Sequence, residues 1–519
     1  MQNIFIVTLG TREIQFKIDE LAENKFEIED LHSSNIKIKH KGNNISFEVF
    51  KNNFYENYLY PVQTRTAGKI ILENFEIFKK IMYFPLINKP FEKIVKENNL
   101  TKFIIVYTDQ IDLTDNDKNK QRDTLYFAEI IKKHYYEKLE KSGSTDFIDI
   151  CINKNVTDID YQYNYFAKKL KEKIKINNNE INKIYLLPQG GIDQINHAFT
   201  LQLLQQYKDK VEIWQQAEGK EANQLQFTNL FLKDLLKNQL NSLIDNLNYN
   251  GAIVICNQYK SLINKKIIRL LDFAHKRKEM LYKDAIKVFN KNEFAFIVDY
   301  INKKYLLTKD FKNITENNNN INDKLVLCIE RLHLSEYYFK INNYTSFTLS
   351  LEIFFESIVL YILSKINEFK IDINKNTFDR KRLVKEFKNK HEEKTQEFTH
   401  ILGVEVLEES FPTQILITEY YAKQNNYKNI LSLIELIKSI NSKLNKFDGI
   451  DSLRNRVAHK GEGIKENELL KIAKNNGNNN MQWWQIDIID KTKELMTQNN
   501  SLNYFEIMNN EIKQTINNF

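Results

Sequence analysis

The chain has 519 residues, enough for two or three domains and a sizeable buried core. Its 75 Lys and Arg against 68 Asp and Glu give a net charge of +7, a mild excess and not the dense positive field of a sequence-reading DNA-binding domain. Cys151, Cys256 and Cys328 are scattered and form no CxxC pair, which argues against a disulfide framework or a thiolate metal site. We therefore expect a multidomain protein of the reducing cytoplasm.

Neither the start of the chain nor its most apolar stretch suggests a membrane protein. The first ten residues, MQNIFIVTLG, lack a basic segment before the apolar run and resemble a β-strand more than a signal peptide. The most apolar helical stretch starts at Leu349, is interrupted by Glu352 and Glu356, and is short for a bilayer. The sequence predicts no membrane segment.

The first 224 residues alternate between short β-branched runs and longer helical patterns. Apolar residues recur at three- and four-residue spacing in the segments 123–139 and 193–207, as in amphipathic helices. This alternation predicts a parallel, doubly wound α/β sheet, with a hairpin over 35–50 that turns at Gly42 and Asn43. The expected strands are 4–9, 102–108, 146–152, 183–189 and 211–214.

Beyond about residue 225 the pattern becomes helical, and only 251–256 remains ambiguous between helix and strand. The polar stretch 315–324 has too little apolar character to pack and is the best candidate for a linker. The expected organisation is a Rossmann-like sheet domain over 1–224, a helical connector and linker over 225–324, and an all-α domain over 325–519.

Three stretches that follow expected strands carry small and polar residues. Parallel strands present their carboxyl ends at one edge of a sheet, where ligands bind. Glycine allows close backbone approach, hydroxyl groups form hydrogen bonds, and a guanidinium pairs with phosphate. The candidates are Thr8, Gly10, Thr11 and Arg12, then Thr108, Asp109 and Gln110, then Gln189, Gly190, Gly191 and Asn196.

The last of these stretches, PQGGIDQIN, places two glycines directly before a helix. Free N–H groups and the positive end of the helix dipole would then face the crevice. An anionic or nucleotide-like ligand fits all three loops, although a single Gly-Gly before a helix is also a common tight turn. Without a GxGxxG fingerprint or Walker lysine spacing, dehydrogenase and ATPase activities are disfavoured.

A second candidate site lies in RNRVAH, residues 454–459. Asp448 and Asp451 are potential helix caps, and the helix should stop at Gly461. An apolar stripe would anchor it through Ile450, Leu453 and Val457, leaving Arg454, Asn455, Arg456 and His459 on the other faces. The plain alternative is a surface helix with a basic face.

Helix geometry constrains what these side chains can do together. Asn455 and His459 lie one turn apart, whereas Arg454 is about 140° from His459 around the axis. Either the arginine curls round, or two copies of the helix face each other in a dimer. Imidazole, guanidinium and amide together suit RNA cleavage without a metal, because they move a proton, stabilise the charged phosphorus centre and orient the reactants.

The combination of these motifs resembles a known family. The sheet loops TLGT, TDQ…RDTLYFAEI and PQGGIDQIN resemble the CARF sensor domain, and RNRVAH resembles the RxxxxH motif of HEPN ribonucleases. In this order they are similar to the Csm/Csx accessory ribonucleases of type III CRISPR systems. The resemblance spans nearly the whole chain and is weakest over about 225–320.

The resemblance implies a homodimer that binds a cyclic oligoadenylate activator and cleaves single-stranded RNA in antiviral defence. By position it makes Arg454, Asn455 and His459 the catalytic residues and the three sheet loops the ligand site. It implies no metal cofactor. The last loop departs from the family, because Ile192 and Asp193 follow the glycines where Thr-Pro is common, and Asp193 would bring a carboxylate near phosphate.

Other readings remain open. The chain could be a non-catalytic cyclic-nucleotide-binding regulator, or a toxin-type HEPN ribonuclease that senses another nucleotide. The resemblance also suggests slow cleavage of the activator by the sensor domain, with Thr8 or Thr11 positioning a ribose hydroxyl. Glu352 and Glu356 could orient Arg454 or His459, although such pairs more often form a solvated stripe. Ring size and RNA base preference are not predicted.

Overall fold

The structure is a computed structural model of residues 1–519. The described residues are all except 32, 34, 41–44, 53–56, 111–119, 140–144, 175–179, 217–219, 290–293, 298–306, 316–323, 375–376, 446, 498–502 and 519. Two compact units make up the chain, and we call them the sheet unit and the helical unit. The sheet unit contains Met1–Leu236 and Asn257–Ile263, and the helical unit contains Lys237–Cys256 and Asn264–Phe519.

The sheet unit is built on a sheet of six strands in the order β12-β11-β10-β1-β8-β9. All neighbours pair in parallel except β12, which is antiparallel to β11. This confirms the predicted doubly wound sheet. The strands are β1 (Gln2–Thr8), β8 (Lys102–Thr108), β9 (Asp146–Ile152), β10 (Ile181–Leu187), β11 (Val211–Gln215) and β12 (Asn223–Leu225).

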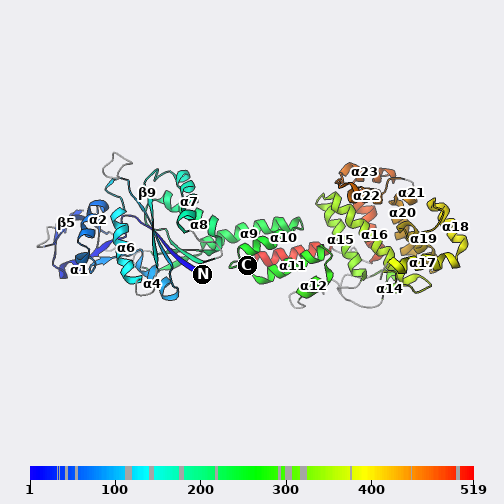
Figure 1. Cartoon of the computed structure of the whole chain (residues 1–519), viewed down its shortest axis with the longest axis horizontal. Coiled ribbons are helices and arrows are strands. Elements are labelled where there is room, and N and C mark those ends of the chain that lie inside the picture. The colour runs from blue at the N-terminus through cyan, green and yellow to red at the C-terminus, as the bar shows by residue number, and fades with distance from the viewer. Residues whose placement is uncertain are drawn as a thin grey trace. The chain divides into compact units, whose positions relative to one another are not determined.

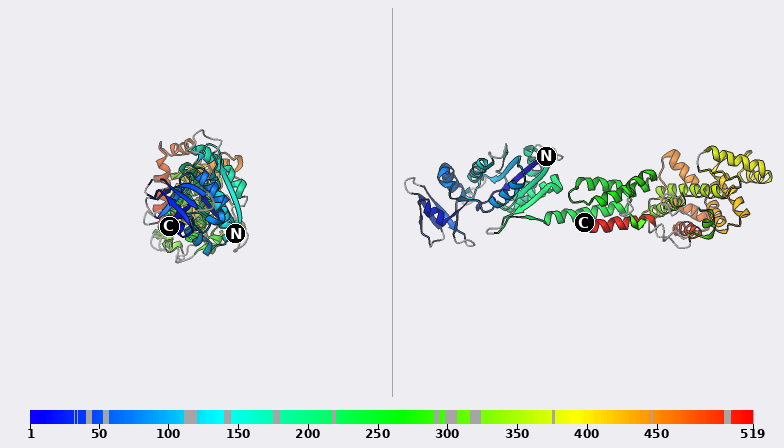
Figure 2. Two further views of the ribbon diagram at one scale, coloured as in Figure 1. Left: turned by 90° about the vertical axis from the view of Figure 1, so that its left-hand side faces the viewer. Right: turned by 90° about the horizontal axis from the view of Figure 1, so that it is seen from below.

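Both faces of this sheet are covered, because alternate side chains of each strand are apolar. Phe5 and Val7 of β1 pack on one face with α4 and α6, whereas Ile4 and Ile6 pack on the other with α7 and α8. Figures 1 and 2 show the strands between these helices. The helices are α4 (Asn88–Glu97), α6 (Leu125–Leu139), α7 (Ile159–Ile174) and α8 (Asp193–Tyr207).

The strand order reverses direction at β1. After β1 the chain builds β8 and β9 on one side and then returns to add β10 and β11 on the other. In a doubly wound sheet such a reversal opens a crevice at the carboxyl ends of the two central strands. Here it places the loops that follow β1, β8 and β10 at one edge, where the ligand residues were predicted.

A second sheet of six antiparallel strands, in the order β3-β4-β5-β6-β2-β7, was not predicted beyond the hairpin. The hairpin over 35–50 is confirmed as β4 paired with β5, and its turn at Gly42 and Asn43 lies outside the described residues. The other strands are only two to four residues long, too short for a periodic signal. The elements are β2 (Gln15–Lys17), β3 (Phe26–Glu29), β4 (Asn35–His40), β5 (Ile45–Lys51), β6 (Tyr58–Pro61) and β7 (Met82–Tyr83), with helices α1 (Ile18–Glu23), α2 (Thr64–Glu73) and α3 (Phe75–Phe78).

The helical unit packs around α16, whose apolar residues Phe347, Leu351 and Phe355 lie in its core. This helix is longer than the apolar run suggested, and among the described helices it alone has the length and composition to cross a bilayer. Two thirds (67%) of its most apolar window is buried inside the unit, so core packing accounts for its composition.

Helices α14, α15, α19 and α22 contact α16 (Tyr344–Ile366). The helices of this unit include α10 (Tyr249–Gln258), α11 (Lys265–Lys278), α12 (Tyr282–Val288), α14 (Lys309–Ile314), α15 (Lys324–Lys340), α17 (Thr377–Lys390), α18 (Glu392–Leu402), α19 (Phe411–Gln424), α20 (Lys428–Ser439), α21 (Ser442–Asn445), α22 (Ile450–Lys460), α23 (Glu466–Asn475), the π-helical η3 (Trp484–Asp490), α24 (Lys491–Met496) and α25 (Tyr504–Asn517).

The connector forms no third unit of its own. Helix α9 (Phe227–Asp245) contains the boundary between the two units, and most of the connector's other described residues belong to the helical unit. The ambiguous run 251–256 lies in helix α10. Most of the predicted linker over 315–324 falls outside the described residues.

Candidate functional site

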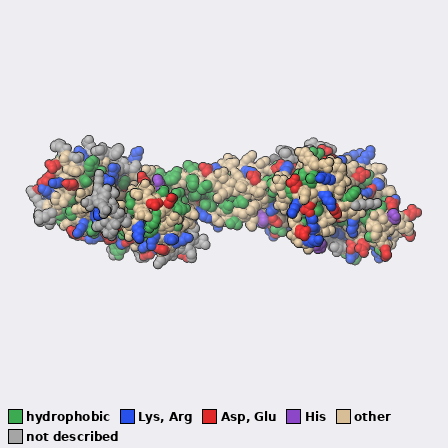
Figure 3. Space-filling model, turned by 90° about the horizontal axis from the view of Figure 1, so that it is seen from above, with side chains coloured by type: hydrophobic (Ala, Val, Ile, Leu, Met, Phe, Trp, Pro, Cys, Tyr) green, Lys and Arg blue, Asp and Glu red, His purple; other side chains and the backbone are tan. Residues whose placement is uncertain are grey.

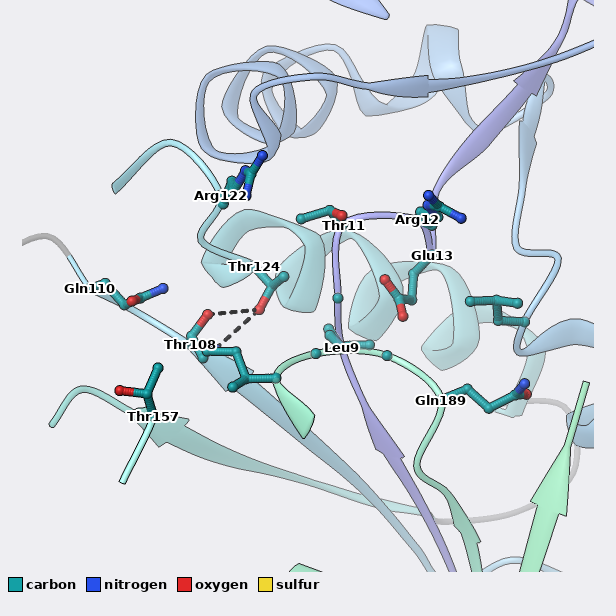
Figure 4. A pocket seen from close by; sticks show the side chains of 15 residues that line it. Leu9, Thr11, Arg12, Glu13, Thr108, Gln110, Arg122, Thr124, Thr157 and Gln189 are labelled. Atoms are coloured by element: carbon teal, nitrogen blue, oxygen red, sulfur yellow. Dashed lines mark hydrogen bonds between the residues drawn. The ribbon is translucent and has the colours of Figure 1, made fainter. Parts of the chain in front are cut away.

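A cavity of about 410 Å³ lies at the carboxyl ends of β1, β8 and β10 (Figure 4). All three predicted loops contribute to its wall, which confirms that the topology brings them together. The predicted residues that line it are Gly10, Thr11, Arg12, Thr108, Gln110, Gln189, Gly190 and Gly191. Thr8, Asp109 and Asn196 are not among its lining residues.

Glycine is required where the first and last loops touch. A Cβ on Gly10 would collide with the backbone N of Gly191, and one on Gly190 would lie 2.5 Å from the carbonyl oxygen of Thr8. Gly191 has φ +88°, a conformation that favours glycine. The sequence stretches LGT and QGG therefore pack backbone against backbone, which leaves peptide groups at the cavity wall.

Two predicted ligand residues hold this glycine turn in place. The Thr8 hydroxyl donates a 2.9 Å hydrogen bond to the carbonyl of Gly190, and the Asn196 amide donates one of 2.8 Å to the same oxygen. Both side chains are buried. The structure therefore places both side chains behind the cavity wall, and of the two threonines suggested for activator cleavage only Thr11 lines the cavity.

Asp109 lies behind the cavity wall and does not line the cavity. Its carboxylate accepts a 2.9 Å hydrogen bond from the guanidinium of Arg65, which also pairs with the buried Asp123. Asp123 in turn accepts a 2.8 Å hydrogen bond from the backbone N–H of Gln110. Burial raises the pKa of Asp123, against the opposing effect of Arg65. This network fixes the loop after β8, so that Gln110 faces the cavity.

Of the residues of the last loop, Gln189 lines the cavity and Asp193 does not. Gln189 lines the cavity, but its amide is committed to the backbone of Gln216, to which it donates at 2.9 Å. Asp193 lies beside a different, largely apolar cavity between α8 and α9. Asp193 is thus not among the residues that line the sheet-edge cavity, although its neighbour Ile192 is.

Several residues that line the cavity were missed. Arg122 and Thr124 lie in the RDTLYFAEI stretch that the resemblance quotes, but they were not named as ligand residues; Thr124 accepts a 3.1 Å hydrogen bond from the backbone N–H of Thr108. Thr157 has no sequence signal that marks it. The remaining members are Leu9, Glu13, Leu86 and Ile192. Arg12 and Arg122 give the wall its positive charge, as an anionic ligand requires.

Glu13 is the buried carboxyl group of this wall. It directly follows Arg12, and in Figure 4 its side chain points toward the middle of the cavity. Burial raises its pKa to about 7, although backbone N–H groups of Gly10, Glu13 and Arg12 act in the opposite direction. Nothing in the pattern TLGTRE distinguishes this glutamate from a solvated one, and it was not predicted.

The second candidate site is carried by α22, which confirms the predicted helix and its end at Gly461. Ile450 and Leu453 are buried, as expected for the inner stripe. The predicted caps are wrong, because the N-cap is Gly449 and no side chain caps the helix. Asp451 instead accepts a 2.8 Å hydrogen bond from the backbone N–H of Ser442, and so ties α22 to α21.

Around α22 the predicted catalytic side chains differ in their surroundings. Arg454 donates a 3.2 Å hydrogen bond to the amide oxygen of Asn455, and its Nε lies 3.8 Å from the buried carboxyl of Glu352 on α16. Burial raises the pKa of Glu352 to about 8, with Arg454 opposing the shift. His459 is exposed in the last turn. Glu352 is buried beside Arg454 without a hydrogen bond to it, so the solvated-stripe alternative does not apply to Glu352.

The neighbouring aromatic and basic residues are structural. Arg456 pairs with Glu468 of α23 and lies 3.7 Å from Glu462, so it braces the end of α22. Trp483 and Trp484 are both buried, and Trp484 donates a 3.1 Å hydrogen bond to the carbonyl of Leu469. Both tryptophans therefore belong to the core of the helical unit.

Known proteins share this architecture. A family model for the CRISPR-associated protein Csm6 6H domain matches residues 228–278. The structure is similar to that of Enterococcus italicus Csm6 bound to cyclic hexa-2′-fluoro-hexa-dAMP, with a TM-score of 0.54 and 15% identity over 99% of this chain and 100% of that chain. No curated protein matches the sequence.

These comparisons confirm the resemblance to Csm6-type CARF–HEPN proteins in the fold of the whole chain and in the sequence of residues 228–278. The sequence match falls within the region where the motif resemblance was weakest. The motif resemblance depends on ligand-binding loops and on catalytic side chains, and the helices α9 to α11 contain no such motif.

Proposed function

We propose that this chain, which has the fold of the Csm6-type proteins, is an endoribonuclease that cleaves single-stranded RNA when a cyclic oligoadenylate occupies its sheet unit. The observation that carries the proposal is the presence of two separate sites in one chain. One is the cavity at the sheet edge, walled by glycine turns and two arginines, and the other is the α22 helix with Arg454 and His459. The proposed domains remain 1–224 for sensing, 225–324 for connection and 325–519 for cleavage.

The cavity suits a cyclic oligonucleotide by its chemistry. Peptide groups of the glycine turns and the guanidinium groups of Arg12 and Arg122 complement phosphates. Thr11, Thr157 and Gln110 add neutral hydrogen-bonding groups for ribose and base. A solved structure with the same fold is bound to a cyclic hexa-adenylate analogue.

The nuclease chemistry follows from the side chains of α22. His459 removes the proton from a ribose 2′-hydroxyl or delivers one to the leaving 5′-oxygen, and Arg454 stabilises the charge that develops on the phosphorus centre. Asn455, hydrogen-bonded to Arg454, orients that guanidinium. The 2′-oxygen attacks the adjacent phosphorus as the 5′-oxygen leaves, which yields a 2′,3′-cyclic phosphate and a 5′-hydroxyl. None of these steps calls for a metal ion.

A homodimer completes this site. Because Arg454 and His459 lie about 140° apart around one helix, two copies of α22 can direct an arginine and a histidine at one phosphate more readily than one copy can.

The sheet unit also has a surface suited to contact between two copies of the chain, which we call the α8–α9 face. Figure 3 shows hydrophobic side chains gathered where these helices lie. The face is formed by Leu201, Phe227, Leu230, Phe231 and Leu235, which are 44% to 60% exposed.

Activation requires a difference in affinity between two conformations. The cyclic oligoadenylate must bind more tightly to the dimer in which the two α22 helices are correctly set, since equal affinity for both states shifts no population. If the sheet unit also cleaves its activator slowly, Thr11 is the residue that can position the ribose hydroxyl, because Thr8 is buried against Gly190.

A fluorescent RNA cleavage assay tests the proposal. The full chain is mixed with RNA in EDTA, with cyclic tetra-adenylate, cyclic hexa-adenylate or neither, and we expect cleavage only with one of the activators. His459→Ala should abolish cleavage and leave activator binding nearly unchanged. Loss of both functions together would contradict the separation of the two sites, and cleavage without activator would favour the toxin-type alternative. Binding without any cleavage would favour a non-catalytic regulator.

A further inference from the structure

Helix α17 presents an exposed row of side chains that neither candidate site uses. Its apolar residues Leu383, Val384 and Phe387 pack into the core of the helical unit and so determine which side of the helix faces outward. The exposed row, which we call the α17 stripe, recurs at steps of three or four residues and covers about 60° of the helix surface over a length of about 16 Å. It consists of Phe378, Arg382, Lys385 and Asn389.

The α17 stripe carries two adjacent cations. Arg382 and Lys385 lie one turn apart, and in the part of the chain that the structure describes neither forms an ion pair or a hydrogen bond. Lys381, on the flank of the stripe, lies 3.5 Å from Glu409 and is thereby partly neutralised. Lys388 adds a further ammonium group to the same flank. The stripe therefore attracts a partner that carries several negative charges in a row.

The aromatic ring of Phe378 distinguishes the α17 stripe from an ordinary basic helix face. A solvated face of lysine and arginine needs no partner. Phe378, however, is 71% exposed, more than any other aromatic residue among those described. A ring, two cations and an amide on one line match single-stranded nucleic acid, because a base stacks on the ring, phosphates pair with Arg382 and Lys385, and Asn389 hydrogen-bonds to a base or sugar. The stripe thus has the chemistry of a nucleic-acid surface.

The α17 stripe belongs to the same packed body as the proposed catalytic helix. Helix α18 stacks on α17 through Phe398 and Phe387, whose ring centroids are 5.8 Å apart. Helix α18 also contacts α21, and α21 is tied to α22 by the 2.8 Å hydrogen bond between Ser442 and Asp451. In Figure 1, α21 lies between α22 and the pair of helices α17 and α18. A strand bound along the stripe can thus continue toward α22 if it is long enough, whereas a very short RNA cannot reach both.

We propose that the α17 stripe binds single-stranded RNA outside the cleavage site and holds the strand that α22 cuts. This inference rests on the proposed function, because its ligand is the substrate of that nuclease. It adds that the chain binds long RNA at two places, so that affinity grows with RNA length. The stripe contributes to substrate affinity and not to the chemical step.

RNA binding by the full chain tests the stripe. Fluorescence anisotropy in EDTA with activator uses a labelled RNA of about 20 nucleotides, and His459→Ala in every form keeps this RNA intact. Arg382→Gln combined with Lys385→Gln should weaken binding at least about tenfold and lower its salt dependence by about two phosphate contacts. Phe378→Leu, which removes the ring but stays apolar, should weaken binding about tenfold without changing the salt dependence.

Two controls separate the stripe from net charge and from the cleavage site. Lys168→Gln combined with Lys171→Gln removes the same charge from an exposed face of α7 in the sheet unit and should leave RNA binding unchanged. With His459 intact, cleavage of a tetranucleotide should be the same in the stripe variants as in the wild type, because so short an RNA occupies α22 without reaching α17. Cleavage of the long RNA should show a raised KM at unchanged kcat.

The outcomes distinguish this inference from the proposed nuclease. Unchanged RNA affinity in both stripe variants, or an equal loss in the α7 control, would overturn the stripe as an RNA surface. Displacement of the RNA by polyglutamate as readily as by unlabelled RNA would make an acidic protein the partner and the RNA assignment wrong. If the stripe variants lose RNA affinity as expected while the wild-type chain cleaves no RNA with any activator, the stripe stands and the proposed nuclease fails.

Discussion

The carboxyl of Glu352 on α16 lies 3.8 Å from Nε of Arg454 on α22, and it is buried whereas the guanidinium is partly exposed. This contact connects the core of the helical unit to the proposed catalytic helix. At neutral pH the carboxyl is largely protonated, because burial raises its pKa to about 8 in spite of Arg454. The contact is therefore polar but only partly ionic.

Glu352 should make the stability of the helical unit depend on pH. Its pKa in the folded state is about 8 against an ordinary value of 4.5, so the folded state binds more protons between these limits. The free energy of unfolding then falls as pH rises through that window, by at most about 1.4 kcal/mol per pH unit. Glu352→Gln should flatten this slope in urea unfolding between pH 5 and 8. Glu356→Gln is the control, and an equal change in both variants would contradict the assignment.

Arg454 and Arg456 should respond differently to the same conservative change. Lysine lacks the planar guanidinium that can stabilise two phosphate oxygens at once, so Arg454→Lys should lower activator-dependent RNA cleavage by about 10²-fold or more. Arg456 pairs with Glu468, and a lysine there keeps the charge that this pair needs, so Arg456→Lys should change the rate much less. Cleavage rates at saturating activator measure both. Equal losses would mean that the two arginines share a structural role.

Gly190→Ala should disturb the sheet-edge cavity. The added methyl group would collide with Oε1 of Glu13 and lie 2.6 Å from the backbone N of Gly10, so the two loops must separate. We expect activator binding to fall at least about tenfold, with a lower melting temperature of the sheet unit. Gly463→Ala is the matched control, since its methyl group would meet only the Thr345 hydroxyl at 3.5 Å. Unchanged binding by Gly190→Ala would show that the glycine contact is dispensable.

Arg65→Met should weaken ligand binding from outside the cavity. It leaves Asp109 and the buried Asp123 without their shared cation, at a cost of about 2 kcal/mol to the stability of the sheet unit. The loop that carries Gln110 should loosen, because its backbone N–H bonds to Asp123. Thermal unfolding and calorimetry measure the two effects. A variant that is less stable but binds the ligand normally would show that Asp109 does not contribute to ligand binding.

Much of the fold could be predicted from periodicity. The parallel strands and the amphipathic helices between them extend over five residues or more, so their patterns are long enough to recognise. The strands β2, β3, β6 and β7 have two to four residues each, and β2 pairs with β6 and β7, which lie far along the chain. A local sequence pattern therefore could not predict the second sheet.

For the candidate sites, too, the sequence determined some features and the tertiary structure determined others. The sequence alone determined that three loops with small or polar residues follow expected strands and that a guanidinium, an amide and an imidazole group share one short helix. Only the tertiary structure decided that Thr8 and Asn196 hold Gly190, that Glu352 reaches Arg454, and that Glu13 lies buried in the cavity wall. The reason is physical. A residue's type fixes which bonds it can make, but burial and the nearest partner, which determine the bond it does make and its pKa, depend on segments far away in the chain.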